Sequence, residues 1–276
     1  MLYEKIDLYQ YFNIAKPNGA KGYLTVYCID QLNETDPNRT RSAMLVMPGG
    51  GYCYVSAREG ESVALAYLSH GINAFILDYS VYPNCYYPTQ IREAAMAMIY
   101  IRENCKKYNI DPETVAAVGF SAGGHLCGCL GNMFSSEVLS DLRNSDFIRP
   151  TAVILSYPVT NYDVPLRTHI GSFNALSNNN EELAKKLSLV DMVNKKSSPA
   201  FIWHTVTDQA VPVCGSIKLA EVYNEMCIPL EVHLFADGPH GASVATKEVG
   251  SDFPKLSCWI NLSVNWLSGL GFKVFS

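Results

Sequence analysis

Short and almost wholly apolar runs alternate along this chain with longer segments of helical periodicity. The runs are residues 43–48, 72–78, 114–120, 151–157, 200–206 and 230–235. Strands that are buried on both faces have such continuous apolar runs, whereas strands with one face in water alternate between apolar and polar residues. The pattern therefore predicts an α/β fold, with a mostly parallel twisted sheet and helices on both of its faces.

The segments between these runs supply the expected helices. Residues 61–70 have a helical pattern that stops at Gly71, and a longer pattern covers about 89–108. Glycine after the last helical residue is a common helix end. Residues 21–29 alternate more regularly than the other runs, and we expect them to form an antiparallel edge of the sheet.

The alternation lapses after the run 151–157, between Pro158 and Pro199. This stretch is rich in Asn and Ser, and only 181–189 has the pattern of a helix. Because long insertions in compact domains are usually functional, we expect a small cap at about 159–198. An α/β or barrel fold accommodates 276 residues around one core, so a single domain over 1–276 is predicted.

Composition excludes several classes of function. The net charge is −5 and Lys and Arg are scattered, so a nucleic-acid partner is not expected. No apolar run reaches the roughly 18 residues of a membrane helix, and charges near Met1 stand where a signal peptide is apolar, which predicts a cytoplasmic protein without a membrane partner. The nine cysteines contain no Cys-x-x-Cys pair. We therefore expect reduced thiols, Cys127 and Cys129 included, and no metal or cofactor.

The segment 119–123, Gly-Phe-Ser-Ala-Gly, stands between a predicted strand and a predicted helix. That context is the one in which G-x-S-x-G forms a tight turn that holds the serine hydroxyl clear of the sheet. Small residues at Gly119 and Gly123 allow such a turn. The pattern thus indicates Ser121 as a nucleophile, which needs a nearby base and an acid that orients the base.

The base and the acid are expected in the loops that follow two late strands. His240 lies among turn-forming residues after the last strand, and Asp208 follows the strand before it. The order serine, aspartate, histidine is the one that this fold uses. Asp237 is the alternative acid, although it shares a loop with His240 and suits a turn. The remaining histidines are interpreted as structural: His70, His125, His169, His204 and His233.

An ester carbonyl under attack also needs N–H donors for its developing negative charge. The glycine run after the first central strand offers Gly50 and Gly51, and the start of the helix after the serine offers Ala122. The lysine and Ser/Thr of a phosphate-binding loop are missing from this run. Tyrosines after the strands are expected to line the pocket for a small-molecule ester: Tyr52, Tyr82 and Tyr157.

Four motifs together resemble the esterase/lipase family related to hormone-sensitive lipase. They are MPGGGY at 47–52, GFSAGGH at 119–125, HTVTDQAVP at 204–212 and DGPHG at 237–241. Within that family the chain is most similar, over about 20–270, to small bacterial acetyl esterases and acyl-sugar (xylan) deacetylases. The resemblance implies an α/β-hydrolase fold and a serine carboxylesterase for short acyl esters of sugars. It also implies Ser121 as the nucleophile, His240 as the general base and acid, and Asp208 as the acid that orients the histidine. The oxyanion donors that it implies are Gly50, Gly51 and Ala122.

Two features of the resemblance leave alternatives open. The lipase-like branch has histidine where this chain has Pro48, so the loop geometry of that branch does not carry over. Residues 56–61 are similar to the deacetylase-like branch, but a solvated helix start explains Arg58 and Glu59 equally well. An amidase or peptidase, a lipase-like esterase and a non-catalytic binding protein are the rival functions. The oligomeric state, including a homo-oligomer, stays open.

Overall fold

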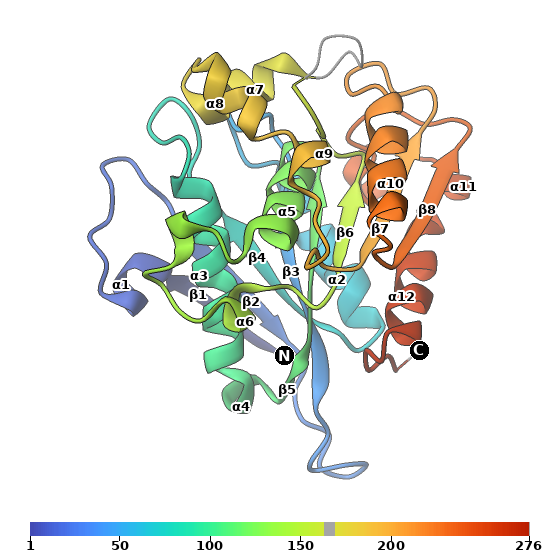
Figure 1. Cartoon of the computed structure of the whole chain (residues 1–276). Coiled ribbons are helices and arrows are strands. Elements are labelled where there is room, and N and C mark those ends of the chain that lie inside the picture. Colours follow the sequence, from blue (N-terminus) through green and yellow to red (C-terminus); the bar gives the residue numbers. More distant parts are fainter. Residues whose placement is uncertain (163–168, 276) are drawn as a thin grey trace.

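The computed structural model describes residues 1–162 and 169–275, which form an eight-stranded sheet in the order β1-β2-β4-β3-β5-β6-β7-β8 (Figure 1). The strands β1 and β2 are antiparallel to each other, β2 is antiparallel to β4, and all other neighbours are parallel. The bounds are β1 Leu2–Asp7, β2 Tyr23–Cys28, β3 Arg41–Met47, β4 Asn73–Asp78, β5 Ile110–Phe120, β6 Val153–Ser156, β7 Ala200–Thr205 and β8 Leu230–Phe235.

Helices cover both faces of the sheet. One face carries α3 (Thr89–Glu103), α5 (Ala122–Met133) and α10 (Cys214–Glu225), and the other carries α2 (Glu61–Ser69) and α12 (Trp259–Gly269). The shorter helices are α1 Leu8–Phe12, α4 Cys105–Tyr108, α6 Ser145–Ile148, α7 Ile170–Ser177, α8 Glu181–Lys186, α9 Leu189–Met192 and α11 Pro254–Ser257, with 3-10 turns η1 Ala57–Glu59, η2 Glu137–Leu139 and η4 Lys247–Val249.

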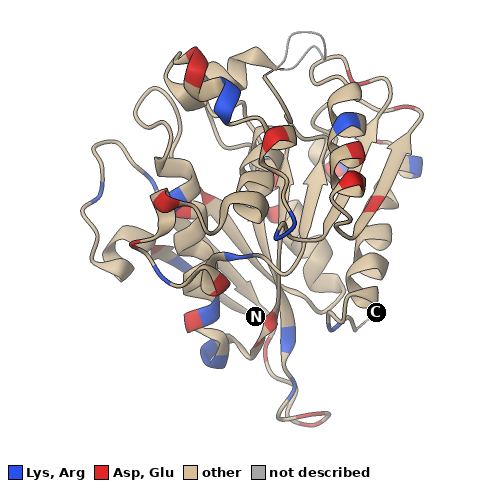
Figure 2. Ribbon diagram, viewed as in Figure 1, with Lys and Arg blue, Asp and Glu red and all other residues tan. Residues whose placement is uncertain are grey.

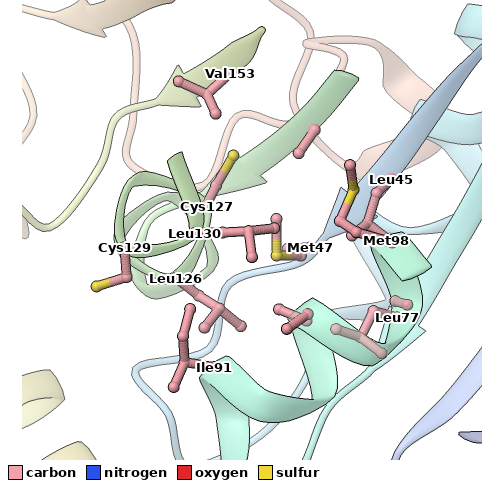
Figure 3. Packing of buried hydrophobic residues seen from close by; sticks show 14 of the residues in the cluster. Leu45, Met47, Leu77, Ile91, Met98, Leu126, Cys127, Cys129, Leu130 and Val153 are labelled. Carbon is pink, nitrogen blue, oxygen red and sulfur yellow. The ribbon is translucent and has the colours of Figure 1, made fainter. Parts of the chain in front are cut away.

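The two cores follow from the period of two along each central strand. In β3, Leu45 and Met47 pack under α3 and α5, whereas Met44 and Val46 pack under α2 and α12. Figure 3 shows Met47 among residues of α3 and α5. Because both sets of side chains are fully buried, the strand is continuously apolar from Ala43 to Met47, which is the pattern seen in the sequence.

The strand expected in residues 21–29 is β2, and it belongs to the antiparallel edge of the sheet as predicted, with the unpredicted β1 paired outside it. The expectation of a single helix in the insertion is wrong. The insertion between β6 and β7 holds α7, α8 and α9 instead of one helix, and residues 163–168 of it lie outside the described part. In Figure 1, α7 and α8 lie over the edge at which the parallel strands end.

Charged residues of both signs are interspersed along the ribbon (Figure 2). No helix in the described ranges combines the length and the apolar character needed to cross a membrane. The carboxyl ends of β3, β5, β7 and β8 meet at one edge, so the loops that follow these strands converge there. In open parallel sheets this edge is where sites form.

Candidate active site

Ser121 forms the turn between β5 and α5. Its backbone has φ 54° and ψ −117°, a strained conformation for a residue with a side chain. A Cβ atom at Gly119 would lie 2.1 Å from the Gly123 carbonyl oxygen, and one at Gly123 would lie 2.2 Å from that of Met47. Glycine is therefore required on both sides, and the turn places Ser121 at the N-terminus of α5.

The turn brings Ser121 to His240 and Asp208, which come from the loops after β8 and β7. The Nε2 atom of His240 lies 2.9 Å from Ser121 Oγ, and its Nδ1 atom lies 2.7 Å from Asp208 Oδ2. An ionised carboxylate only accepts hydrogen bonds, so Nδ1 carries the proton of a neutral imidazole. Nε2 is then free to accept the serine proton, as a general base must.

Asp208 is held in the orientation that this arrangement needs. Its Oδ1 accepts from the Ala210 and Val211 amides at 2.9 Å each, and its Oδ2 also lies 3.1 Å from Nε2 of His204. Burial raises the pKa of Asp208, but the hydrogen bonds from His204 and His240 outweigh it and lower the pKa well below its usual range. Asp208 is thus a carboxylate at neutral pH.

Asp237, the alternative acid, lies elsewhere. Its Oδ1 accepts from the Thr207 hydroxyl at 3.1 Å, on the exposed side of the loop. The structure therefore brings Asp208 to the imidazole of His240 and leaves Asp237 in the turn. This arrangement agrees with the order of strands: Asp208 follows β7, the neighbour of β8 in the sheet.

A cavity of about 350 Å³ opens in front of Ser121 and His240. Its walls come from the glycine loop after β3, from η1, from the insertion and from the His240 loop. They are formed by Gly50, Gly51, Cys53, Tyr54, Ser56, Arg58, Glu59, Ser121, His169, Gly171, Ala210, His240 and Gly241. A larger groove of about 730 Å³ at the opposite edge, around Arg102, Pro112 and Arg149, contains none of these residues.

The glycine loop stands directly beside the serine. Gly50 and Gly51 have φ of 128° and 63°, and a Cβ atom at Gly50 would lie 2.1 Å from the Tyr54 carbonyl oxygen. These backbone angles favour glycine. Within the described ranges, the amides of Gly50, Gly51 and Ala122 have no protein acceptor. They are free to donate to a ligand, as oxyanion donors must be.

The tyrosines expected in the pocket lie beneath it or beside it instead. Tyr52 and Tyr157 are each 1% exposed, and Tyr82 is half-buried against the core. None of the three lines the cavity, whereas the exposed Tyr54 does. The physical reason is that hydrogen bonds in the interior hold two of these hydroxyls away from the cavity. Tyr52 Oη lies 2.8 Å from His125 Nδ1, and the Tyr157 hydroxyl donates to Glu59 at 2.6 Å.

Most of the remaining histidines have structural surroundings. His125 is buried between Tyr52 and the Leu187 carbonyl, and burial lowers its pKa to about 4. His233 pairs with Glu231 along β8. His204 is fully buried behind Asp208.

Two residues on the cavity wall were not expected there from the sequence. His169, interpreted as structural, lines the cavity from the insertion, where no motif pointed to it. Its Nδ1 atom accepts from the Ser172 amide at 3.3 Å, which leaves the protonated Nε2 of a neutral ring as a donor. Glu59 is 3% exposed, so the interpretation as a solvated helix start is wrong for this residue. Arg58 beside it is exposed, as expected.

Comparison with known proteins agrees with this site. The BD-FAE family model matches residues 31–223. The chain belongs to the BD-FAE family. It shares 37% identity over 75% of its length with endo-1,4-beta-xylanase B of Butyrivibrio fibrisolvens, and 26% over 76% with the acetylxylan esterase of Xylanibacter ruminicola. The chain spans 33% and 42% of these two relatives.

A solved structure covers almost the whole chain. The acetyl ester-xyloside bifunctional hydrolase of Caldicellulosiruptor lactoaceticus has 32% identity and a TM-score of 0.84, and the match covers 98% of this chain and 97% of that one. The carboxylesterase Cest-2923 of Lactobacillus plantarum shares the fold, with a TM-score of 0.83 at 24% identity. The α/β-hydrolase fold predicted from the sequence is thereby confirmed.

Proposed function

We propose that this chain is a serine carboxylesterase that removes short acyl groups, acetyl foremost, from sugars or similar alcohols. The observation that carries the proposal is the hydrogen-bonded series from Asp208 through His240 to Ser121, which ends in a cavity beside the free amides of Gly50 and Gly51. A nucleophile, a base, an orienting acid and oxyanion donors in one place are the parts that acyl transfer needs.

The reaction proceeds in two halves. Ser121 Oγ attacks the ester carbonyl carbon while its proton passes to His240 Nε2, and the amides of Gly50, Gly51 and Ala122 stabilise the oxyanion. The C–O bond to the alcohol breaks, and His240 returns the proton to the leaving oxygen. Water then attacks the acyl-serine while His240 takes its proton. The second oxyanion collapses, the bond from the acyl carbon to Ser121 Oγ breaks, and His240 returns the proton to Oγ, which frees the carboxylic acid and restores Ser121.

Two observations support a small acyl group on a polar alcohol. The cavity of about 350 Å³ stands at the lower end of the range for ligand pockets. Its wall carries hydrogen-bonding side chains, namely Arg58, His169, Ser56 and Tyr54, which suit hydroxyl groups on the alcohol. The Xylanibacter ruminicola relative is an acetylxylan esterase, and the Caldicellulosiruptor structure is an acetyl ester-xyloside hydrolase.

The test is a panel of p-nitrophenyl esters of increasing chain length beside acetylated xylo-oligosaccharides. We expect kcat/KM to fall for acyl chains longer than propionyl or butyryl. Each added methylene that clashes with the cavity wall lowers kcat/KM by a few-fold to about a hundredfold. Higher kcat/KM on acetylated sugars than on p-nitrophenyl acetate would support the sugar alcohol. A rise through octanoyl would overturn the deacetylase proposal in favour of a lipase-like esterase, and turnover of anilides alone would favour an amidase.

A further inference from the structure

Glu59 is a buried carboxylate between two loops of the site. It ends η1 and is 3% exposed. Its Oε2 accepts the Gly49 amide at 2.8 Å, and its Oε1 accepts the Tyr157 hydroxyl at 2.6 Å. Gly49 directly precedes the two glycines proposed as oxyanion donors, so one carboxylate oxygen fixes the start of that loop.

The other carboxylate oxygen leads to the histidine loop. The Tyr157 oxygen accepts the Ser243 amide at 2.9 Å, and the Tyr157 ring packs edge-on against His240 with centroids 5.1 Å apart. The Ser243 hydroxyl donates back to the Arg58 carbonyl at 2.6 Å. Glu59 therefore connects the glycine loop to the loop of the general base through a single tyrosine.

An ionised carboxylate matches this pattern of donors best. The Gly49 N–H can only donate, and the Tyr157 hydroxyl, whose oxygen accepts from Ser243, donates its proton to Glu59. Both oxygens of Glu59 then act as acceptors, whereas an amide replaces one of them with an NH2 donor and protonation turns one of them into an O–H donor. The groups that face Glu59 are Tyr157, Tyr79, Arg58 and His240. Burial raises its pKa, and the hydrogen bonds from Tyr157 and Gly49 limit the rise.

We propose that Glu59, as a carboxylate, is a positioning residue that holds the glycine loop and the His240 loop in register, so that oxyanion donors and base meet the same carbonyl. The inference rests on the proposed function of the site. Oxyanion stabilisation depends on preorganised donors, and losing one such donor typically costs about a hundredfold to a thousandfold in kcat. Displacing the loop that carries these donors lowers kcat by a smaller factor than losing a donor does.

The test compares Glu59→Gln with Glu93→Gln. Glu93 is a matched control because it is fully buried and accepts the Ser80 amide at 2.6 Å and the Tyr9 hydroxyl at 2.9 Å, outside the cavity wall. We expect Glu59→Gln to lower kcat on p-nitrophenyl acetate by roughly ten- to a hundredfold with KM changed less than about threefold. Glu93→Gln changes thermal stability and leaves kcat of the folded fraction unchanged.

Two further readouts separate positioning from a structural role. The wild-type log kcat/KM falls more steeply at acid pH than that of Glu59→Gln, because burial raises the pKa of Glu59 and its protonation adds a loss that the variant lacks. Tyr157→Phe, which keeps the ring, lowers kcat and adds little to the Glu59→Gln loss, since both act on one path. Additive losses, or equal slopes, would contradict the proposal.

A third readout, the rate at which a fluorophosphonate labels Ser121, does not depend on which ester is the substrate. This probe forms a tetrahedral adduct that needs the base and the oxyanion donors but no sugar pocket. We expect labelling of Glu59→Gln to be at least about tenfold slower than that of the wild type. Equal labelling rates would overturn the positioning role alone, whereas a wild type that is labelled but hydrolyses no ester would overturn the proposed function alone.

Discussion

Two histidines on opposite sides of Asp208 bind the same carboxylate oxygen. His240 Nδ1 lies 2.7 Å from Oδ2, and His204 Nε2 lies 3.1 Å from it. Each histidine turns its other nitrogen to a serine: His240 to Ser121 at 2.9 Å, and His204 to Ser216 at 2.8 Å. The molecule thus contains two Ser-His-Asp series that share one aspartate.

The two series differ in access and in backbone. The His240 side chain is 23% exposed in the cavity, whereas His204 and Ser216 are fully buried. Ser121 stands on a strained turn beside free amides, whereas Ser216 lies within the regular helix α10. The comparison teaches that the hydrogen-bond pattern is not sufficient for catalysis. A substrate carbonyl must also reach the serine, and preorganised N–H donors must be in place to bind its oxygen.

The strongest test of this difference between the two series is to remove each serine hydroxyl in turn. Ser121→Ala is expected to lower kcat by at least about a thousandfold, because only binding and oxyanion contributions remain. Ser216→Ala is expected to lower it less than about tenfold, since this hydroxyl meets no substrate. The measurement is p-nitrophenyl acetate turnover, with circular dichroism to verify folding. Near wild-type turnover in Ser121→Ala would show that another residue is the nucleophile.

The next largest effect concerns the shared acid. Asp208→Asn is expected to lower kcat by about a thousandfold or more, because the amide can hold His240 in the wrong tautomer and cannot stabilise its charged form. Asp237→Asn is expected to cost less than about threefold, since the amide oxygen of Asn still accepts from the Thr207 hydroxyl, which also lies 3.1 Å from the Gly238 carbonyl oxygen. Greater damage to kcat from the Asp237 change, at equal stability, would transfer the acid role to Asp237.

The sequence predicted the parts of this arrangement that depend on local pattern. Continuous apolar runs indicated the parallel strands, and Ser121, Asp208 and His240 were found because each follows a strand in a loop of turn-forming residues. Strand order then brings such loops together. The position of β1 at the edge was missed because pairing of two alternating strands has no local signature.

Side-chain direction beyond the strand ends was not predictable in the same way. Tyr52 and Tyr157 follow strands as the triad residues do, yet their hydroxyls turn inward to His125 and Glu59. Whether such a ring lines a cavity depends on partners that are far away in sequence. Glu59 shows the converse, because a charged residue in a glutamate-rich segment is normally solvated, and only the Gly49 and Tyr157 donors keep it buried.

The inner histidine offers a finer test of the comparison. His204→Gln removes a hydrogen bond to the Asp208 carboxylate, and such charge-assisted bonds contribute about 1.5 kcal/mol or more. We expect roughly a tenfold loss of kcat, far less than for His240→Gln. The measurement is kcat/KM together with kcat for both variants. Equal losses in the two variants would mean that the buried series takes part in the chemistry as directly as the open one.

The smallest expected effect is on stability at acid pH. The pKa of Asp208 is lower in the folded protein than in the unfolded chain, because its partners His204 and His240 and the Val211 amide outweigh burial. The unfolded chain therefore takes up the proton first as the pH falls, so the stability from this group is fully present above about pH 4 and is lost below it. Asp208→Asn removes this contribution, and its Tm is expected to fall less steeply than that of the wild type between about pH 5 and pH 3. Asp237→Asn, at an exposed position, keeps the wild-type slope and is the control. Parallel curves for Asp208→Asn and the wild type would show that the two histidines do not hold the carboxylate more tightly than water does, and the shared-aspartate comparison would lose its energetic basis.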